Sequence, residues 1–207
     1  MQTVFAQMAV SLDGYVAGPG DGPANPLGDG GEQVHEWMVG LASWRERHGE
    51  TGGHRDASDE LVAETVARAG ATVMGRRMFD NGEEPWGPEP PFGHPVFVVT
   101  HRARDPLPRE GGTTFTFVID GIERALGLAR AAAGDADVEV AGGADVVQQC
   151  LVAGLLDELE IHVVPVFLGG GVRLRGRPEL AGVRLELTRV VDSPGVTHLR
   201  YARPAAG

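Results

Sequence analysis

Short apolar runs alternate with helical patterns along most of the chain. The apolar runs are rich in β-branched residues and stop at turn residues, as buried strands do. They predict strands over residues 3–12, 71–75, 95–101, 114–118, 138–142 and 157–168. Between them, apolar residues recur every three or four positions. This spacing predicts helices that begin near Ser58, at Ile122 and directly after the Gly142–Gly143 pair, with a further helical start at Arg76.

Two more strands are predicted near the C-terminus, over residues 183–192 and 195–202, with the turn sequence Ser193-Pro194-Gly195 between them. Strands that alternate with helices and are apolar along their whole length are typical of a parallel sheet covered on both faces. The pattern therefore predicts the α/β class, with a central mixed, mostly parallel sheet flanked by helices and a C-terminal antiparallel hairpin.

Residues 18–56 interrupt this alternation. Residues 18–31 are dense in Gly, Pro, Asp and Asn, which indicates a loop. A chain of 207 residues fits one domain, so we expect a single domain over residues 1–207 with an insertion at about 18–56. Near-helical spacing predicts one short helix inside the insertion, with its apolar positions at Val34, Trp37, Met38, Leu41 and Trp44.

The composition narrows the possible partners. The formal net charge is −11, so the average surface repels nucleic acid and anionic membranes, and we expect neither as a partner. Cys150 is the one cysteine and sits on an apolar helix face, which excludes a disulfide framework and suits the reducing cytoplasm. The N-terminus lacks a signal-peptide pattern, and no run of about 18 apolar residues occurs. We therefore expect a cytoplasmic protein.

Three predicted strand ends carry residues suited to phosphate groups. In open sheets of this kind, ligands bind beyond the carboxyl ends of the strands. Gly142 and Gly143 allow close approach of the backbone, and the next helix turns its first N–H groups toward the same place. The segment Gly75-Arg76-Arg77 adds two guanidinium groups, and Thr100-His101-Arg102 adds a hydroxyl and two possible cations. Together these ends predict a pocket for a ligand with several phosphates.

Each of these features also has a plainer interpretation. Two glycines after a strand are commonly only a tight turn, and exposed arginines are commonly solvated surface. The glycine spacing of the Rossmann fingerprint is absent, since Gly142 and Gly143 are adjacent and no third glycine follows in register. The agreement of three separate strand ends favours the pocket.

Four motifs together resemble a known family. They are SLDG (residues 11–14), VMGRRMFD (73–80), VFVVTH (96–101) and the long segment AGGADVVQQCLVAGLLDELEIHVVPVFLGGG (141–171). These motifs resemble the dihydrofolate-reductase-like superfamily, in the branch of the reductase domain of the bacterial riboflavin-biosynthesis deaminase-reductase. The resemblance implies a single-domain fold of the class predicted above, NADPH as cofactor, and a homodimer in which residues 160–168 and the edge hairpin are a plausible interface.

The resemblance also implies roles for individual residues. Ala9, Asp13 and Val16 would lie beside the nicotinamide. Thr100, His101 and Arg102 match the segment that grips the 2′-phosphate, which favours NADPH over NADH, because a guanidinium donates twice to a dianionic phosphate. The remaining positions implied to hold phosphate are Gly75, Arg76, Arg77, Gly142, Gly143, Ala144, Asp145 and Val146.

The substrate side is less defined by the sequence. Folate reductases place an acid at the start of the helix before the Gly-Arg corner, and Asp59 is the nearest candidate, although an acid also suits a helix N-terminus. Asp13 is a second candidate for moving a proton, with turn chemistry as its alternative. Trp37 and Trp44 could stack on a flat heterocycle or pack in the core. The riboflavin-pathway reductases commonly carry an acid where this chain has Ala141.

Three functions remain open at this point. The first is an NADPH-dependent reductase that transfers hydride to a small heterocyclic or carbonyl substrate, of pterin-, pyrimidine- or folate-like type. The second is an NADPH-binding protein with little or no catalysis, acting as a sensor or scavenger. The third is a deazaflavin-dependent reductase that uses the same pocket. No metal is expected, because His35, His48 and His54 lack a regular ligand spacing.

Overall fold

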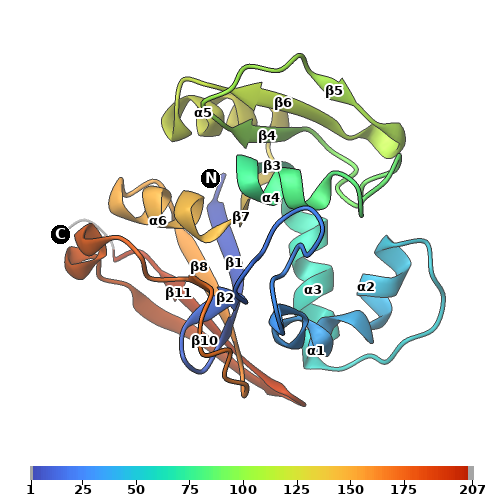
Figure 1. Ribbon diagram of the computed structural model, residues 1–207, viewed down its shortest axis with the longest axis vertical. Coiled ribbons are helices and arrows are strands. Elements are labelled where there is room, and N and C mark those ends of the chain that lie inside the picture. The colour runs from blue at the N-terminus through green and yellow to red at the C-terminus, as the bar shows by residue number, and fades with distance from the viewer. Residues whose placement is uncertain (1, 205–207) are drawn as a thin grey trace.

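A nine-stranded mixed sheet forms the centre of the protein in the computed structural model, which describes residues 2–204 (Figure 1). The strand order is β10-β11-β8-β1-β7-β3-β4-β6-β5. The strands are β1 (Val4–Ser11), β3 (Ala69–Gly75), β4 (Val96–Val99), β5 (Leu107–Pro108), β6 (Thr114–Val118), β7 (Asp137–Gly142), β8 (Glu158–Val164), β10 (Glu186–Ser193) and β11 (Val196–Ala202).

The six strands from β8 to β6 run parallel, as the alternation of strands and helices predicts. The C-terminal hairpin is confirmed: β10 pairs with β11, and β11 pairs antiparallel with β8. Three short strands lie outside the prediction. The strand β5 closes the other edge, and β2 (Tyr15–Ala17) pairs with β9 (Val172–Arg173) in a separate ribbon.

Helices α5 (Ile122–Ala133) and α6 (Ala144–Val152) cover one face of the sheet, as Figure 1 shows on the left. This face holds the main apolar core, which includes Val73, Val138, Val140 and the helix residues Ala125 and Val147. Cys150 lies in the same cluster and is fully buried, as expected, and burial raises the pKa of its thiol to about 12. The core therefore lies between these two helices and the parallel strands.

Helix α3 (Ala57–Arg68) covers the opposite face, and several of its contacts with the sheet are polar. The Ser58 hydroxyl is 2.9 Å from Nε2 of His198, Glu64 forms an ion pair with Arg200 at 2.6 Å, and Gln7 donates to the Thr65 hydroxyl. The expectation of strands that are apolar on both faces is therefore wrong for this side. Side chains alternate along β7 and β8, so Glu139, Glu160 and His162 share the face that α3 covers.

The insertion contains three short helical segments where one helix was expected. They are the 3₁₀ helix η1 (Gly31–Val34), α1 (Glu36–Val39) and α2 (Ala42–Arg47), and they lie beside α3 (Figure 1). The break falls at Gly40 and Leu41, where Leu41 is extended and the backbone of Gly40 accepts from the N–H of His54 at 3.0 Å. A Cβ on Gly40 would lie 2.9 Å from the His54 ring. This close approach explains the interruption of the helical spacing.

Several boundaries differ from the prediction by a few residues. The strand β8 ends at Val164, not at residue 168, because the chain turns at Pro165 and the Val166 N–H donates back to the Val164 carbonyl. The remaining helices are α4 (Arg76–Gly82) and the 3₁₀ helices η2 (Glu110–Gly112) and η3 (Pro178–Gly182). Within residues 2–204, none of the helices has both the length and the apolar character needed to cross a membrane.

Arg68, the last residue of α3, joins the helix to three strands. Its guanidinium donates to Asp137 of β7 and Glu158 of β8, both at 2.8 Å, and lies over the Phe5 ring of β1, 4.2 Å from the centroid. Replacement of Arg68 would leave two partly buried carboxylates without their cation. We therefore predict that Arg68→Met lowers the free energy of unfolding in urea by about 1–3 kcal/mol.

The matched control is Arg124→Met on α5, where the arginine is exposed. This substitution should change the free energy of unfolding by less than about 0.5 kcal/mol. Equal stability of the two variants would show that the Arg68 contacts do not hold α3 on the sheet.

Candidate active site

The three predicted phosphate-binding ends lie on neighbouring parallel strands. Strand β7 ends at Gly142, β3 ends at Gly75 and β4 is followed by Thr100, and these strands are adjacent in the order β7-β3-β4. A Cβ on Gly75 would lie 2.9 Å from Cγ2 of Val146 and 3.6 Å from the backbone N of Gly143. The sequence places glycine where two backbones and a helix side chain meet.

The Gly142–Gly143 corner leads directly into α6. Its peptide bond is cis, and Gly142 has φ +127°, a conformation that favours glycine. A Cβ on Gly143 would meet nothing within 4 Å, so open space lies beside the backbone there. Ala144 and Val146 are buried in the first turn of α6, whose N–H groups point toward this space. An anion fits such a helix start well.

The two arginines after Gly75 have different surroundings. Arg76 donates from Nε to Asp80 at 2.6 Å, and its guanidinium lies 5.8 and 5.7 Å from the ring centroids of Phe79 and Phe117. Arg77 forms an ion pair with Asp21 of the insertion and also donates to the Asp21 carbonyl. The Arg77 guanidinium thus ties the insertion loop to α4, and its expected phosphate role stays a prediction.

The third corner is a short turn with two exposed side chains. The Thr100 N–H continues the sheet by donating to the Val118 carbonyl at 3.0 Å, and the Thr100 hydroxyl accepts from the Arg102 N–H at 3.0 Å. This turn leaves the side chains of His101 and Arg102 exposed at the sheet edge. They are placed to meet a ligand that extends outward from β4.

Asp13 is used by the turn after β1. One carboxylate oxygen accepts from the Ser11 hydroxyl at 2.6 Å and from the Leu168 N–H at 3.1 Å, and the other accepts from the Gly169 N–H at 2.7 Å. The hydrogen bonds from Ser11 and from these amides lower the pKa of the Asp13 carboxyl. An ionised carboxylate with these partners fits the turn alternative and is a poor proton donor.

The remaining expected cofactor residues surround the same region. Ala9 is buried and lines a pocket between α3, the sheet and the insertion. Val16 of β2 packs against the main core cluster. Asp145 is exposed and forms an ion pair with Arg177 at 2.7 Å. Its carboxylate at the helix start is thus neutralised by a neighbouring chain segment.

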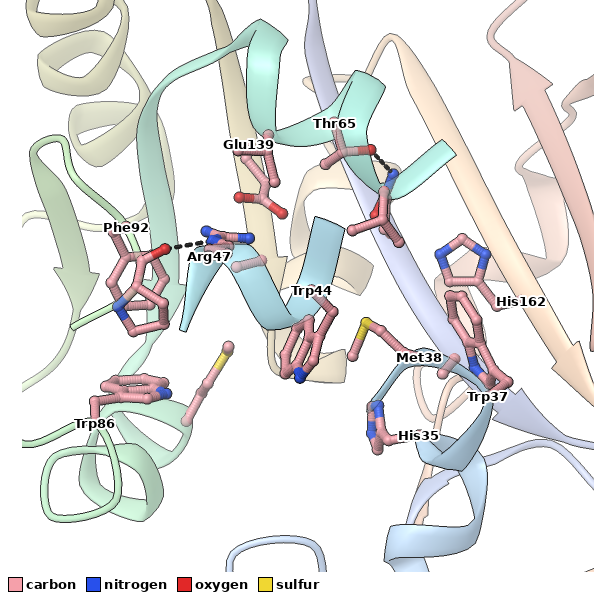
Figure 2. A pocket seen from close by; sticks show the side chains of 17 residues that line it. His35, Trp37, Met38, Trp44, Arg47, Thr65, Trp86, Phe92, Glu139 and His162 are labelled. Atoms are coloured by element: carbon pink, nitrogen blue, oxygen red, sulfur yellow. Dashed lines mark hydrogen bonds between the residues drawn. The ribbon is translucent and has the colours of Figure 1, made fainter. Parts of the chain in front are cut away.

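A pocket of about 200 Å³ lies between α3, the sheet and the insertion (Figure 2). Ala9 of β1 and Ala141 of β7 line it, so it borders the Gly142 corner directly. Met78 also lines the pocket, and its sulfur would lie 3.4 Å from a Cβ on Gly142. The other lining residues are Gln7, His35, Trp37, Met38, Trp44, Arg47, Val62, Thr65, Val66, Trp86, Pro91, Phe92, Glu139 and His162.

Aromatic rings form much of the pocket wall. Trp86 and Phe92 meet edge to face with centroids 5.1 Å apart, and Trp44 comes from α2 (Figure 2). Trp37 contacts the pocket and also packs on His162, with centroids 5.0 Å apart. Both tryptophans that the sequence offered for a flat substrate therefore line the same pocket, although Trp37 is also part of the packing.

An acidic side chain, Glu139, and a basic one, Arg47, reach the pocket from different elements. Burial raises the pKa of the Glu139 carboxyl, while the nearby Arg47 and the Thr72 hydroxyl act in the opposite direction. Burial lowers the pKa of the Arg47 guanidinium, which donates to the Pro91 carbonyl. Figure 2 shows Glu139 directed toward Arg47. The pocket thus combines flat apolar walls with a few polar groups, as small-molecule sites do.

A buried imidazole pair borders the other end of the pocket. Nδ1 of His162 is 2.8 Å from Nδ1 of His198, whose Nε2 meets the Ser58 hydroxyl. Burial lowers the pKa of His162 to about 3 and that of His198 to about 4, so both rings are neutral at pH 7. Glu160 comes within metal-ligand range of both rings, but Arg200 occupies its carboxylate at 2.8 Å. These polar groups therefore satisfy one another.

Asp59 lies outside the set of described residues that line the pocket. Its carboxylate accepts from the Ser43 N–H at 2.7 Å and from Arg55 at 3.1 Å. Burial opposes its charge, but these bonds together lower the pKa of the Asp59 carboxyl. Asp59 therefore fastens the insertion helix α2 to α3, which suits the helix-terminus alternative better, and its expected substrate role stays a prediction.

Sequence reasoning missed Glu139, Arg47, Gln7 and Thr65 as pocket residues. A signal for Glu139 was present, because Glu139 and Ala141 are two positions apart in one strand and so share a face. The chain thus has an acid two residues before Ala141 on the same face of the strand. Arg47 carried no such signal, since it enters from an insertion whose position the strand pattern does not fix.

Comparison with solved structures supports the fold. A protein assigned to riboflavin biosynthesis from Shewanella sp. PV-4 superposes with a TM-score of 0.63 at 22% identity, over 98% of this chain and 99% of that one. A pyrimidine reductase-like protein from Corynebacterium diphtheriae gives 0.57 at 14% identity, over 99% and 93%. Dihydrofolate reductase from Enterococcus faecalis, complexed with NADP(H) and RAB-propyl, gives 0.55 at 15% identity, over 97% and 96%.

Comparison with curated proteins gives no match. The model of one protein family, the RibD C-terminal domain, matches residues 2–199, nearly the whole chain. The fold predicted from the motifs is that of the dihydrofolate reductase structure above. The chain belongs to the RibD C-terminal domain family.

Proposed function

We propose that this protein is an NADPH-dependent reductase that transfers hydride to a small heterocyclic or carbonyl substrate of pterin-, pyrimidine- or folate-like type. The observation that carries the proposal is the continuity of two features. Ala141 lines the aromatic pocket and directly precedes the glycine corner, and the sulfur of Met78, another lining residue, would lie 3.4 Å from a Cβ on Gly142. A ligand with phosphates at the corner would therefore extend its other end into the pocket.

The residues at the corner fit a dinucleotide. The backbone of Gly142 and Gly143, the first turn of α6 and Gly75 would hold the pyrophosphate, and Ala9 would lie beside the nicotinamide. Thr100, His101 and Arg102 would hold the 2′-phosphate. NADPH, when bound, supplies a hydride with its electron pair and leaves as NADP⁺. The protein's own task is to orient the substrate, exclude water and supply a proton.

The pocket lining supports a flat, polar-edged substrate. Trp44, Trp86 and Phe92 offer ring faces for stacking. The carboxyl of Glu139 and the amide of Gln7 offer hydrogen bonds at the rim of a heterocycle. The descriptions of the Shewanella protein, in riboflavin biosynthesis, and of the Corynebacterium protein, as pyrimidine reductase-like, agree with such a substrate class.

Two further expectations belong to this proposal. We expect a homodimer, because the edge strand β10 exposes Leu187 (54%) and Val190 (56%) at the end of the sheet. We also expect the protein to work in the cytoplasm. A protein that binds NADPH tightly but reduces no member of a substrate panel would fit the sensor alternative instead.

Arg102 provides the test of cofactor choice. We predict that Arg102→Ala raises the Kd for NADPH about 10- to 100-fold, because charge-assisted hydrogen bonds to the 2′-phosphate are lost. The Kd for NADH should stay within about twofold, since NADH lacks that phosphate. Nucleotide fluorescence titration measures both values.

The matched control is Arg124→Ala, which removes an exposed arginine from α5. It should leave both dissociation constants unchanged. Equal, weak binding of NADPH and NADH by the unmodified protein would contradict the assignment of the 2′-phosphate segment.

Trp44 provides the test of the substrate pocket. We predict that Trp44→Ala raises the KM for 7,8-dihydrofolate or another panel substrate at least about fivefold, because a stacking face is lost. The Kd for NADPH should not change. The control is Val39→Ala, an exposed position of the same insertion. A KM that moves equally in both variants would place the substrate elsewhere.

A further inference from the structure

We propose that Glu139 is the catalytic acid of this site, and that Thr72 and His94 form the route by which solvent replaces its proton. The inference rests on the proposed reductase function and deepens it. It assigns a task to three residues that the cofactor corner does not use.

Glu139 has the right position for this task. It comes from the middle of β7, lines the pocket and points inward between α3 and the sheet (Figure 2). Ala141 follows on the same face, about 7 Å further along the strand, and directly precedes the Gly142 corner. A substrate ring that spans this distance would meet the cofactor end of the pocket with one atom and Glu139 with a neighbouring one.

The surroundings of Glu139 favour a neutral carboxyl. The charged or titratable groups that face it are Arg47 from α2 and, through Thr72, His94 before β4. The Arg47 guanidinium lowers the pKa of Glu139, but burial raises it by more, so the net direction is upward. A carboxyl whose pKa is raised keeps its proton to higher pH and is better suited to donate it.

A chain of side chains leads from Glu139 toward solvent. The Thr72 hydroxyl, fully buried on β3, is 3.4 Å from Oε2 of Glu139 and 2.7 Å from Nε2 of His94. His94 is half-exposed, and burial together with Arg47 lowers its pKa to about 4, so its ring is neutral at pH 7. A hydroxyl donates and accepts at once, and a neutral imidazole has one nitrogen for each role. The chain can therefore pass one proton inward.

For a C=N substrate, the hydride and the proton reach adjacent atoms of the ring. The ring carbon accepts the hydride, the C=N π electrons move to nitrogen, and the nitrogen takes the proton of Glu139. The carboxylate then takes the hydroxyl proton of Thr72, Thr72 takes the Nε2 proton of His94, and Nδ1 of His94 takes a proton from solvent. The substrate gains one hydride and one proton, all three residues end neutral, and His94 returns from its Nδ1–H to its Nε2–H tautomer by proton exchange with solvent before the next turnover.

The other acids and histidines near the site are less suited. Asp13 and Asp59 are ionised and hold hydrogen bonds that serve the fold. His162 reaches the pocket, but its lowered pKa keeps it neutral, and a neutral imidazole N–H is a very weak acid. Among the described pocket residues, Glu139 alone combines a raised carboxyl pKa with a link toward solvent.

The first experiment uses Glu139→Gln, which keeps the size and removes the acid. With NADPH and a panel of neutral C=N heterocycles that begins with 7,8-dihydrofolate, we expect kcat to fall about 10²- to 10⁴-fold. The Kd for NADPH should stay the same, and Glu139→Asp should recover part of the rate. In the unmodified protein, activity should decline as pH rises through the pKa of Glu139, and the Gln variant should lack this decline.

A second readout needs no substrate. Infrared difference spectra of the unmodified protein against Glu139→Gln should show the C=O stretch of a protonated carboxyl at neutral pH. Its absence, or undiminished turnover by Glu139→Gln, would overturn the assignment of Glu139 while leaving the reductase function standing. An unmodified protein that binds NADPH but reduces no panel member would overturn the function, and the inference with it.

The route is tested by Thr72→Val, which removes the hydroxyl at nearly constant shape. We expect kcat to fall about 3- to 30-fold with an altered solvent deuterium isotope effect, while KM and NADPH binding stay unchanged. The control is Thr116→Val on β6, which lies outside the described pocket lining. Identical rates and isotope effects in Thr72→Val and the control would remove Thr72 and His94 from the proposal.

Discussion

Helix α3 is held on the sheet by hydrogen bonds and ion pairs, and this polar contact governs the site. Ser58 contacts His198 and Glu64 contacts Arg200, both on β11. Arg68 pairs with Asp137 of β7 and Glu158 of β8. Apolar side chains would have closed the gap between helix and sheet, because apolar cores pack densely. Directional contacts placed along the helix fix its position while leaving space between them. The pocket occupies that space.

The same constraint explains the electrical character of the pocket. Polar side chains that are buried must find partners or give up their charge. The imidazoles of His162 and His198 do both, since they bond to each other and stay neutral. Arg200 pairs with Glu160, which opposes the rise that burial causes in the pKa of the Glu160 carboxyl. Glu139 lies beyond these pairs, next to the pocket, where a bound ring would remove the remaining water. A dry site of this kind strengthens every interaction with the substrate.

Much of the fold could be predicted because local patterns determine it. The strands of the parallel sheet, the helices α5 and α6 and the hairpin each follow from apolar spacing and turn residues, and the glycine corner follows from the motifs. The polar face could not be found in this way, since Glu160 and His162 lie in a run of predominantly apolar residues that resembles a buried strand. The insertion also differs from the prediction of one helix, because the helical spacing is broken at Gly40 by its contact with His54, fourteen residues further along the chain. Arg47 reaches the pocket only through that geometry.

The choice among three acidic residues, Asp13, Asp59 and Glu139, shows most clearly what the sequence alone does not reveal. From the sequence, Asp13 and Asp59 are stronger candidates for a catalytic acid than Glu139, since Asp13 follows a strand and Asp59 begins a helix. In the structure each of these carboxylates accepts a hydrogen bond from a backbone N–H group, from Gly169 for Asp13 and from Ser43 for Asp59. Such bonds stabilise the ionised form and make the side chain part of the fold. Glu139 sits in mid-strand, where the backbone N–H groups belong to the sheet and none is left to stabilise its charge. Burial therefore raises the pKa of its carboxyl against the opposing effect of Arg47 and Thr72, and the acid with the least support from backbone N–H groups is the one best suited to give a proton away.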